Sequence, residues 1–242
     1  MSETLVEVVP DAEVLASAVA ARLVVAMLDA QAIRGTAAVV LTGGRIAARV
    51  LGAIKDLPAS RGIDWSRVDL WWGDERFLPG GDPERNETQA REALLDALPL
   101  DPARVHPMAA SDGPDGDDAA AAAARYADEL GDDPRFDVLM LGVGEDGHVA
   151  SIFPGHPVGD ETGVTAAVHD SPKPPPTRIT LTLPAIHRAD EVWLIASGEG
   201  KADAVGSVLG GSAPGGSDLP AGRATGRNRT RWLLDRAAAA KL

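Results

Sequence analysis

The stretch FDVLMLGVGEDGHVASIFP, residues 136–154, carries the strongest indication of the fold. It opens with an almost continuous apolar run that ends at Gly142. A strand that is buried on both faces of a parallel sheet has such a run, whereas a strand with one solvent face alternates apolar and polar residues. We therefore expect residues 136–142 to form an inner strand of a parallel sheet.

Similar apolar runs recur on both sides of this stretch, with amphipathic segments between them. The sequence predicts further strands over residues 37–41, 68–72, 165–169, 178–183 and 191–197. It predicts helices over residues 11–31, 44–57, 87–98, 118–130, 201–209 and 230–240. Strand and helix alternate, which indicates an α/β fold with a largely parallel sheet flanked by helices. Because no linker-like stretch divides the chain, we expect one domain over residues 1–242.

Composition narrows the classes of function. The net charge of −13 argues against binding to nucleic acid or to an anionic membrane surface, although a small phosphorylated ligand can still be held by a few local cations. The chain has no cysteine, which excludes thiolate metal sites and cysteine nucleophiles. The N-terminus lacks the basic start and apolar run of a signal peptide. We therefore expect a soluble, cytoplasmic protein.

The glycines at 142, 144 and 147 match the G-x-G-x-x-G dinucleotide fingerprint, but the chain reaches Pro154 where that motif needs a full helix. The glycines instead bring Asp146 and His148 out at the end of a buried strand. A neutral imidazole oriented by a carboxylate suits a general base near neutral pH. The alternative is that His148 only caps the following turn. The other four histidines are better explained as surface or loop residues.

Two more strand ends carry polar residues. Gly43 and Gly44 follow the strand at 37–41, and the N-terminus of the next helix can offer free N–H groups to a phosphate. No Gly-Lys-Ser/Thr follows, so this is not a nucleotide P-loop. Asp74 and Arg76 follow the strand at 68–72. Taken alone, the first pattern is also typical of a tight turn and the second of a solvated cluster.

Three cations, Lys173, Arg178 and Lys201, lie near predicted strand ends. Each could be an ordinary surface charge, which is the usual place of Lys and Arg. Arg in particular suits bidentate recognition of phosphate. If the carboxyl ends of parallel strands meet at one sheet edge, these cations and the Gly43-Gly44 turn can form one phosphate site.

In their order and spacing, these segments resemble the 6-phosphogluconolactonase family over nearly the whole chain. The blocks that carry the resemblance are Thr42-Gly-Gly44, Asp74-Glu-Arg76 with Pro79, Gly142 through Pro154, and Arg178 through Pro184, with Gly198-Glu-Gly-Lys-Ala202 and Trp232-Leu-Leu-Asp235 as further matches. One position departs: the family usually has small hydroxyl residues after Gly-Gly, whereas this chain has Arg45 and Ile46.

The resemblance implies a fold shared with glucosamine-6-phosphate deaminases and ribose-5-phosphate isomerases. It implies hydrolysis of 6-phospho-D-glucono-1,5-lactone to 6-phosphogluconate, in the oxidative pentose phosphate pathway, by water that His148 activates. The implied catalytic residues are His148, Asp146 and Arg76, and the implied phosphate contacts are Gly43, Gly44, Arg178 and Lys201. Beside these we expect Asp74 among the catalytic residues and Arg45 and Lys173 among the substrate and phosphate contacts, although Arg45 could also point away from the phosphate. No metal or other cofactor is implied. We expect a monomer or small homo-oligomer whose ligand is the sugar-phosphate lactone.

Three other functions are compatible with parts of this pattern. A glucosamine-6-phosphate deaminase usually has an aromatic residue after Asp-Glu and Asn-Glu-Pro after the His block, where this chain has Arg76 and Ile152-Phe-Pro154. A non-catalytic sugar-phosphate-binding regulator would not need both Asp146 and His148. The hypothesis of a nicotinamide-dependent dehydrogenase depends on the glycine fingerprint alone.

Overall fold

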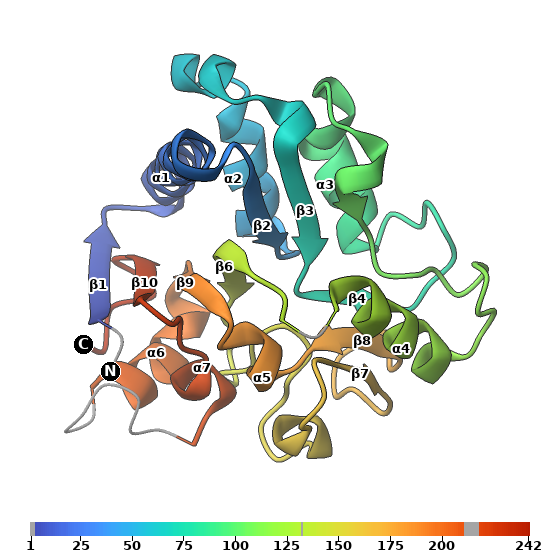
Figure 1. The fold of residues 1–242 in the computed structure, drawn as a ribbon. Helices are drawn as coiled ribbons and strands as arrows, with labels where there is room; N and C mark the ends of the chain where they lie inside the picture. The colour runs from blue at the N-terminus through green and yellow to red at the C-terminus, as the bar shows by residue number, and fades with distance from the viewer. Residues whose placement is uncertain (1–2, 132, 211–217) are drawn as a thin grey trace.

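Seven parallel strands form the central sheet of the computed structural model, which describes residues 3–131, 133–210 and 218–242. Across the sheet the strands are β1 (Glu3–Val9), β10 (Arg229–Asp235), β9 (Ala189–Ala196), β6 (Phe136–Gly142), β2 (Ala37–Leu41), β3 (Val68–Trp72) and β5 (Val105–His106). Figure 1 shows β1 and β10 at one side of this sheet and β3 at the other. The predicted inner strand at 136–142 lies between β9 and β2.

Both faces of the sheet are covered, and side chains alternate between two cores. In β6, Val138 and Met140 face one core while Leu139 and Leu141 face the other. The first core contains α1 (Ala12–Arg34), α2 (Arg45–Ile54) and α3 (Asn86–Ala93). The second contains α4 (Ala119–Leu130), α5 (Leu183–Ile186), α6 (Ala202–Leu209) and α7 (Pro220–Arg223). Burial on both faces explains the long apolar runs in the inner strands β2, β6 and β9.

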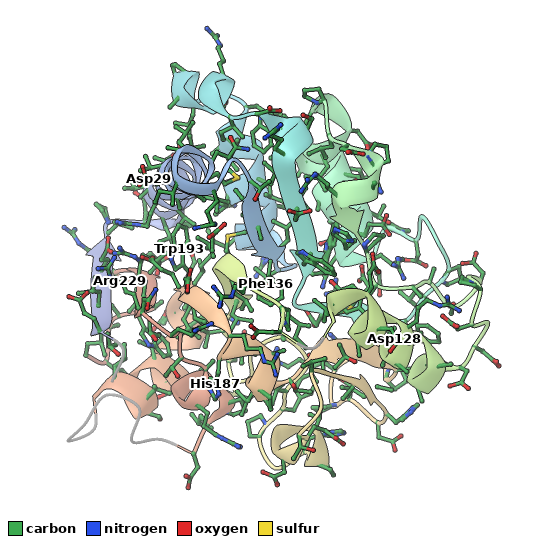
Figure 2. All side chains as sticks on the ribbon, in the orientation of Figure 1. Asp29, Asp128, Phe136, His187, Trp193 and Arg229 are labelled. Carbon is green, nitrogen blue, oxygen red and sulfur yellow. The ribbon has the colours of Figure 1, made fainter. Side chains whose placement is uncertain are left out.

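Local sequence explains how the longest helix begins. Asp11 precedes α1 in an extended conformation, and its carboxylate accepts hydrogen bonds from the N–H groups of Glu13 and Val14. This satisfies two of the donors that a helix start leaves without a partner. Trp193 of β9 packs on the side of the sheet that α1 covers (Figure 2). Among the described residues, short 3-10 helices lie at Pro58–Gly62, Trp65–Arg67, Leu95–Ala97, Pro102–Arg104, Pro157–Asp160 and Glu199–Lys201.

A second, three-stranded antiparallel sheet lies on the α4 side, in the order β4 (Asp74–Arg76), β8 (Arg178–Leu181) and β7 (Thr165–Val168). The expectation that residues 165–169 and 178–183 join the parallel sheet is therefore wrong. The physical reason is the short connection between β7 and β8, because a parallel pair needs a crossover of about a dozen residues or more. Arg178 and Lys201 consequently do not lie on one parallel edge.

The predicted helix over residues 230–240 is also wrong, because Arg229–Asp235 forms β10 and turns follow it. Trp232 and Leu234 pack in one core and Leu233 in the other, which is the two-residue period of a strand. The partner of β10, the edge strand β1, was not predicted. Ion pairs of Arg229 with Glu3 and of Arg231 with Glu7 join the two strands, and Figure 2 shows Arg229 beside β1.

The predicted fold class, an α/β domain with a largely parallel sheet flanked by helices, is confirmed. Its extent over residues 1–242 stays a prediction. Within the described ranges, no helix combines the length and the apolar character needed to cross a membrane.

Candidate active site

A cavity of about 430 Å³ opens at the carboxyl ends of β2, β6 and β9, where the small sheet approaches the large one. The strands β2 and β6 are neighbours in the large sheet. The next strand of this sheet after β2 is β3, toward one edge, whereas the next after β6 is β9, toward the other edge. Open α/β sheets bind ligands at such a reversal of strand order. Of the ten predicted site residues, the following eight line the cavity: Gly43, Gly44, Arg45, Asp74, Arg76, His148, Arg178 and Lys201.

The turn after β2 forms one part of the cavity wall. Gly43 has to be a glycine, because a Cβ atom there would lie 1.8 Å from Oδ1 of Asn86. α2 begins directly after Gly44, which provides no side-chain cap, so the first N–H groups of the helix lie at the cavity. Arg45 and Arg49 also line the cavity, one helical turn apart. The first turn of α2 therefore presents both N–H groups and guanidinium groups to an anion.

His148 and Asp146 form a hydrogen-bonded pair at the exit of β6. The distance between Nδ1 of His148 and Oδ1 of Asp146 is 2.5 Å. This contact occupies Nδ1 and leaves Nε2 as the nitrogen available for proton transfer. Gly144 makes room for the pair, since a Cβ atom there would lie 1.9 Å from Nδ1 of His148. The ring of His148 packs on Phe153, with 4.6 Å between the ring centroids.

Lys173 lies beside this pair and does not line the cavity. Its Nζ is 3.4 Å from Oδ1 of Asp146 and 3.4 Å from Nδ1 of His148. Burial lowers the pKa of His148, the hydrogen bond and charge of Asp146 raise it, and Lys173 lowers it, with a net lowering from the ordinary value. Burial opposes the lowering of the Asp146 pKa, but the contacts with His148 and Lys173 outweigh it. His148 is therefore neutral, and Asp146 ionised, near neutral pH.

Asp74, in β4 of the small sheet, lies in a buried hydrogen-bond network. Its Oδ2 accepts a 2.7 Å hydrogen bond from Oγ of Ser151 and lies 3.9 Å from Nη1 of Arg178. Arg178 in turn donates from Nε and Nη2 to the carbonyl oxygens of residues 173–175. Burial lowers the pKa of Arg178, and the charge of Asp74 counteracts this lowering. The guanidinium group is thus held in one orientation with Nη1 toward Asp74.

The lining of the cavity is strongly cationic, although the whole chain is acidic. Asp74 is the one carboxylate among the described lining residues, against the cations Arg45, Arg49, Arg76, Arg178 and Lys201. In the part of the chain that the structure describes, the side chains of Arg45, Arg49 and Lys201 make no hydrogen bond or ion pair. Burial lowers the pKa of Lys201, and the charge of Glu145 counteracts this lowering. An anionic ligand would supply the missing partners.

Three contributors to the site were missed at the level of sequence. Arg49 and Asn86 line the cavity. Asp235, at the end of β10, accepts hydrogen bonds from Oγ of Ser197 at 2.6 Å and from the N–H of Gly198 at 3.1 Å, so it fixes the turn that leads to Lys201. Only Arg49 had a local signal, because it lies four residues after Arg45 and thus on the same helix face.

No group of three or more His, Cys, Asp or Glu side chains among the described residues is arranged to hold a metal ion. Asp146 and Asp74, the two carboxylates of the site, are each occupied by hydrogen bonds or ion pairs to neighbouring side chains. What the arrangement can do is bind an anion and place a neutral imidazole next to it.

Comparisons with known proteins show what the chain is similar to. Residues 10–232 match the family described as glucosamine-6-phosphate isomerases/6-phosphogluconolactonase. The chain is 60% identical to the 6-phosphogluconolactonase of Streptomyces coelicolor, over 96% of this chain and 92% of that protein. It is 51% identical to the 6-phosphogluconolactonase of Mycobacterium tuberculosis, with 98% of each chain covered.

The structure of a 6-phosphogluconolactonase from Trypanosoma brucei superposes with a TM-score of 0.84 at 26% identity and covers 100% of both chains. A monomeric glucosamine-6-phosphate deaminase shares the fold, with a TM-score of 0.80 at 21% identity over 98% of this chain and 100% of that one. The chain therefore belongs to the family of glucosamine-6-phosphate isomerases and 6-phosphogluconolactonases.

Proposed function

We propose that this chain hydrolyses 6-phospho-D-glucono-1,5-lactone to 6-phosphogluconate, the lactone-opening step of the oxidative pentose phosphate pathway. The observation that carries the proposal is that His148 lines the same cavity as cations whose side chains make no hydrogen bond or ion pair in the described part of the chain. The 6-phosphogluconolactonase names of relatives at 51–60% identity support the substrate. Arg76, where deaminases usually have an aromatic residue, favours lactone hydrolysis over deamination.

His148 acts as the general base in this proposal. Its Nε2 takes a proton from a water molecule as the water oxygen attacks the carbonyl carbon of the lactone. Asp146, bonded to Nδ1, holds the ring orientation and stabilises the imidazolium ion that forms. Arg76 lies where it can stabilise the negative charge on the carbonyl oxygen.

The tetrahedral intermediate collapses by breaking the bond between the carbonyl carbon and the ring oxygen. The ring oxygen takes the proton from His148 and becomes a hydroxyl group, and the new carboxylic acid loses its proton to solvent. Water is thus added across the ester, and His148 ends neutral as it began. No covalent intermediate is needed, because a base and a positioned ester are sufficient.

In this proposal the phosphate group binds in the same cavity, at the turn after β2. Gly43 and Gly44 bring the backbone close, and the side chains of Arg45 and Lys201 make no hydrogen bond or ion pair in the described part of the chain. Arg178 contributes Nη1, its nitrogen that makes no bond to the 173–175 carbonyls. Lys173, which we predicted among the substrate and phosphate contacts, has in this proposal a different task, which is to adjust the charge of the His148–Asp146 pair.

The test is a hydrolysis assay on the purified protein, with the spontaneous opening of the lactone as baseline and a glucosamine-6-phosphate deaminase assay beside it. We expect acceleration of lactone opening, undiminished by a chelator, and no deaminase activity. A rate equal to the spontaneous one would overturn the proposal. Deaminase activity without lactonase activity would assign the chain to the other branch of its family.

A further inference from the structure

Asn86, the first residue of α3, lies against three parts of the cavity wall at once. Its Nδ2 donates to the main-chain oxygen of Asp74 at 2.8 Å and to Oδ1 of Asp74 at 3.2 Å. Its Oδ1 accepts a 2.9 Å hydrogen bond from Nη1 of Arg76. The same Oδ1 occupies the space that a side chain at residue 43 would need. Asn86 is only 4% exposed, so these contacts are sheltered from water.

The backbone of Asn86 is held in place by the carboxyl group of Glu75. Oε1 of Glu75 accepts hydrogen bonds from the N–H groups of Arg76 at 2.8 Å and Asn86 at 2.7 Å, and Oε2 accepts from the N–H of Glu87 at 2.9 Å. Glu75 therefore caps α3 from a distant strand, a task that helix caps usually perform with a local side chain. Fully buried Arg85 lies 3.7 Å from Oε2 of Glu75. The position of Asn86 is thus fixed by its surroundings.

A carboxamide is the side chain that these two neighbours require. Asp74 is an acceptor and needs a donor, whereas Arg76 is a donor and needs an acceptor. A carboxylate at this position would satisfy Arg76 and repel Asp74, and an apolar side chain would leave both without a partner.

We propose that Asn86 is a positioning residue that fixes the Asp74 carboxylate and the Arg76 guanidinium relative to each other and to the Gly43-Gly44 turn. The inference rests on the proposed function, since it assigns Asn86 a part in lactone opening through these two side chains. Misplacing reacting groups by a fraction of an ångström is costly, so the effect belongs in kcat rather than in KM.

The direct test is Asn86→Asp, which keeps the size of the side chain and exchanges its donor for a second carboxylate beside Asp74. We expect kcat for the phosphorylated lactone to fall roughly 10- to 100-fold with a smaller change in KM. Two charged or titratable groups act on Asp74 across space: Arg178, 3.9 Å away, and His148, whose pKa the charge of Asp74 raises. Two more lie next to it in β4: Glu75 and Arg76, of which Arg76 shares Asn86 with Asp74 as a hydrogen-bond partner. Two adjacent carboxylates bind a proton more readily than one, so the acidic limb of the pH–rate profile should move to higher pH.

Asn228→Asp is a matched control, because exposed Asn228 also donates to a carboxylate, Oδ1 of Asp190, far from the cavity. It should leave both kcat and the pH profile unchanged. Asn86→Ser, a smaller variant that fits the site and can serve only one neighbour, should give an intermediate loss. Thermal unfolding of each variant shows whether activity falls because less protein is folded or because the folded protein has a lower kcat.

Two outcomes with an active wild type would overturn this inference alone. In the first, Asn86→Asp keeps its kcat within twofold of the wild type. In the second, it loses rate only in proportion to the amount of folded protein, and its pH profile does not move. If Asn86→Asp does not fold, the same reading applies to Asn86→Ser, with kcat per folded molecule as the deciding quantity. A wild type without lactonase activity would overturn the proposed function first, and this inference with it.

Discussion

The two walls of the cavity are built in opposite ways. The open wall consists of Gly43, Gly44, Arg45, Arg49 and Lys201, from the ends of β2 and β9. The bonded wall consists of Asp74, Arg76, Asn86 and Arg178, from the small sheet and α3, and Ser151 supports Asp74 from behind this wall. On the open wall the cationic side chains make no hydrogen bond or ion pair with the described residues, whereas on the bonded wall each side chain is hydrogen-bonded or ion-paired to others.

This difference separates two tasks. Charges without partners can meet an anion from solvent, and their contribution appears as binding. Side chains that are already fixed need no rearrangement during the reaction, and their contribution appears as rate. His148 belongs with the fixed groups, since Asp146 orients it.

The largest expected effect concerns His148. His148→Ala should lower kcat by about 10²- to 10⁴-fold with a smaller change in KM, because the general base is lost. Asp146→Asn should cost less, since it removes the orientation of the ring and not the base. His169→Ala, at an exposed histidine outside the cavity, is the control and should retain full activity. If His148→Ala keeps a wild-type kcat, His148 only caps its turn.

The next effect tests the open wall. Lys201→Gln should reduce kcat/KM for the phosphorylated lactone by roughly 10- to 150-fold, mainly through KM, since one charge-assisted contact contributes about 1.5–3 kcal/mol. It should barely change hydrolysis of the unphosphorylated lactone. Arg61→Gln, at an exposed arginine outside the cavity, is the control. Equal losses on both lactones would place Lys201 in the chemistry and remove the distinction between the walls.

Arg178→Gln should affect both phosphate binding and the rate of ring opening. Arg178 lines the cavity but also holds Asp74 and the carbonyl groups of residues 173–175. We therefore expect losses on both lactones, with the larger loss on the phosphorylated one. An effect confined to the phosphorylated lactone would move Arg178 to the open wall.

The support beneath the bonded wall should show in stability. Burial raises the pKa of Glu75 to about 7, against the lowering by Arg85 and three backbone N–H groups. Between pH 4.5 and 7 the unfolded chain has lost this proton and the folded chain still holds it, so stability falls as the pH rises. Relative to Glu75→Gln, the wild type should lose as much as about 3 kcal/mol of unfolding free energy across this window.

Denaturant unfolding at pH 4.5 and pH 7.5 measures this difference, with Glu92→Gln as a control at an exposed carboxyl. A difference between wild type and Glu75→Gln that does not change with pH would mean that Glu75 titrates alike in both states.

The smallest effect concerns Lys173. Its ammonium group is one of the causes that lower the pKa of His148, after burial. Lys173→Met should raise that pKa, so the acidic limb of kcat/KM should move to higher pH while the rate at pH 8 stays nearly unchanged. Lys55→Met, at an exposed lysine outside the cavity, provides the control profile. A shift to lower pH would show that Lys173 does not act on the charge of His148.

Sequence predicted the open wall better than the bonded wall, for physical reasons. The strands that end at Leu41, Gly142 and Ala196 have long apolar runs because both their faces are buried, and the turns that follow them are local features. β4 pairs with β8, about a hundred residues later in the chain, and nothing local to either indicates this pairing. Asn86 has no sequence signal because its partners come from other elements.

The measurement that tests the account most directly is the ratio of kcat/KM for the phosphorylated lactone to kcat/KM for its unphosphorylated counterpart, in the wild type with a chelator present. Two or more charge-assisted contacts from the open wall predict a ratio of at least about a hundred. A ratio near one, or no acceleration of either lactone over spontaneous opening, would contradict the division of the cavity into a wall that binds phosphate and a wall that opens the ring.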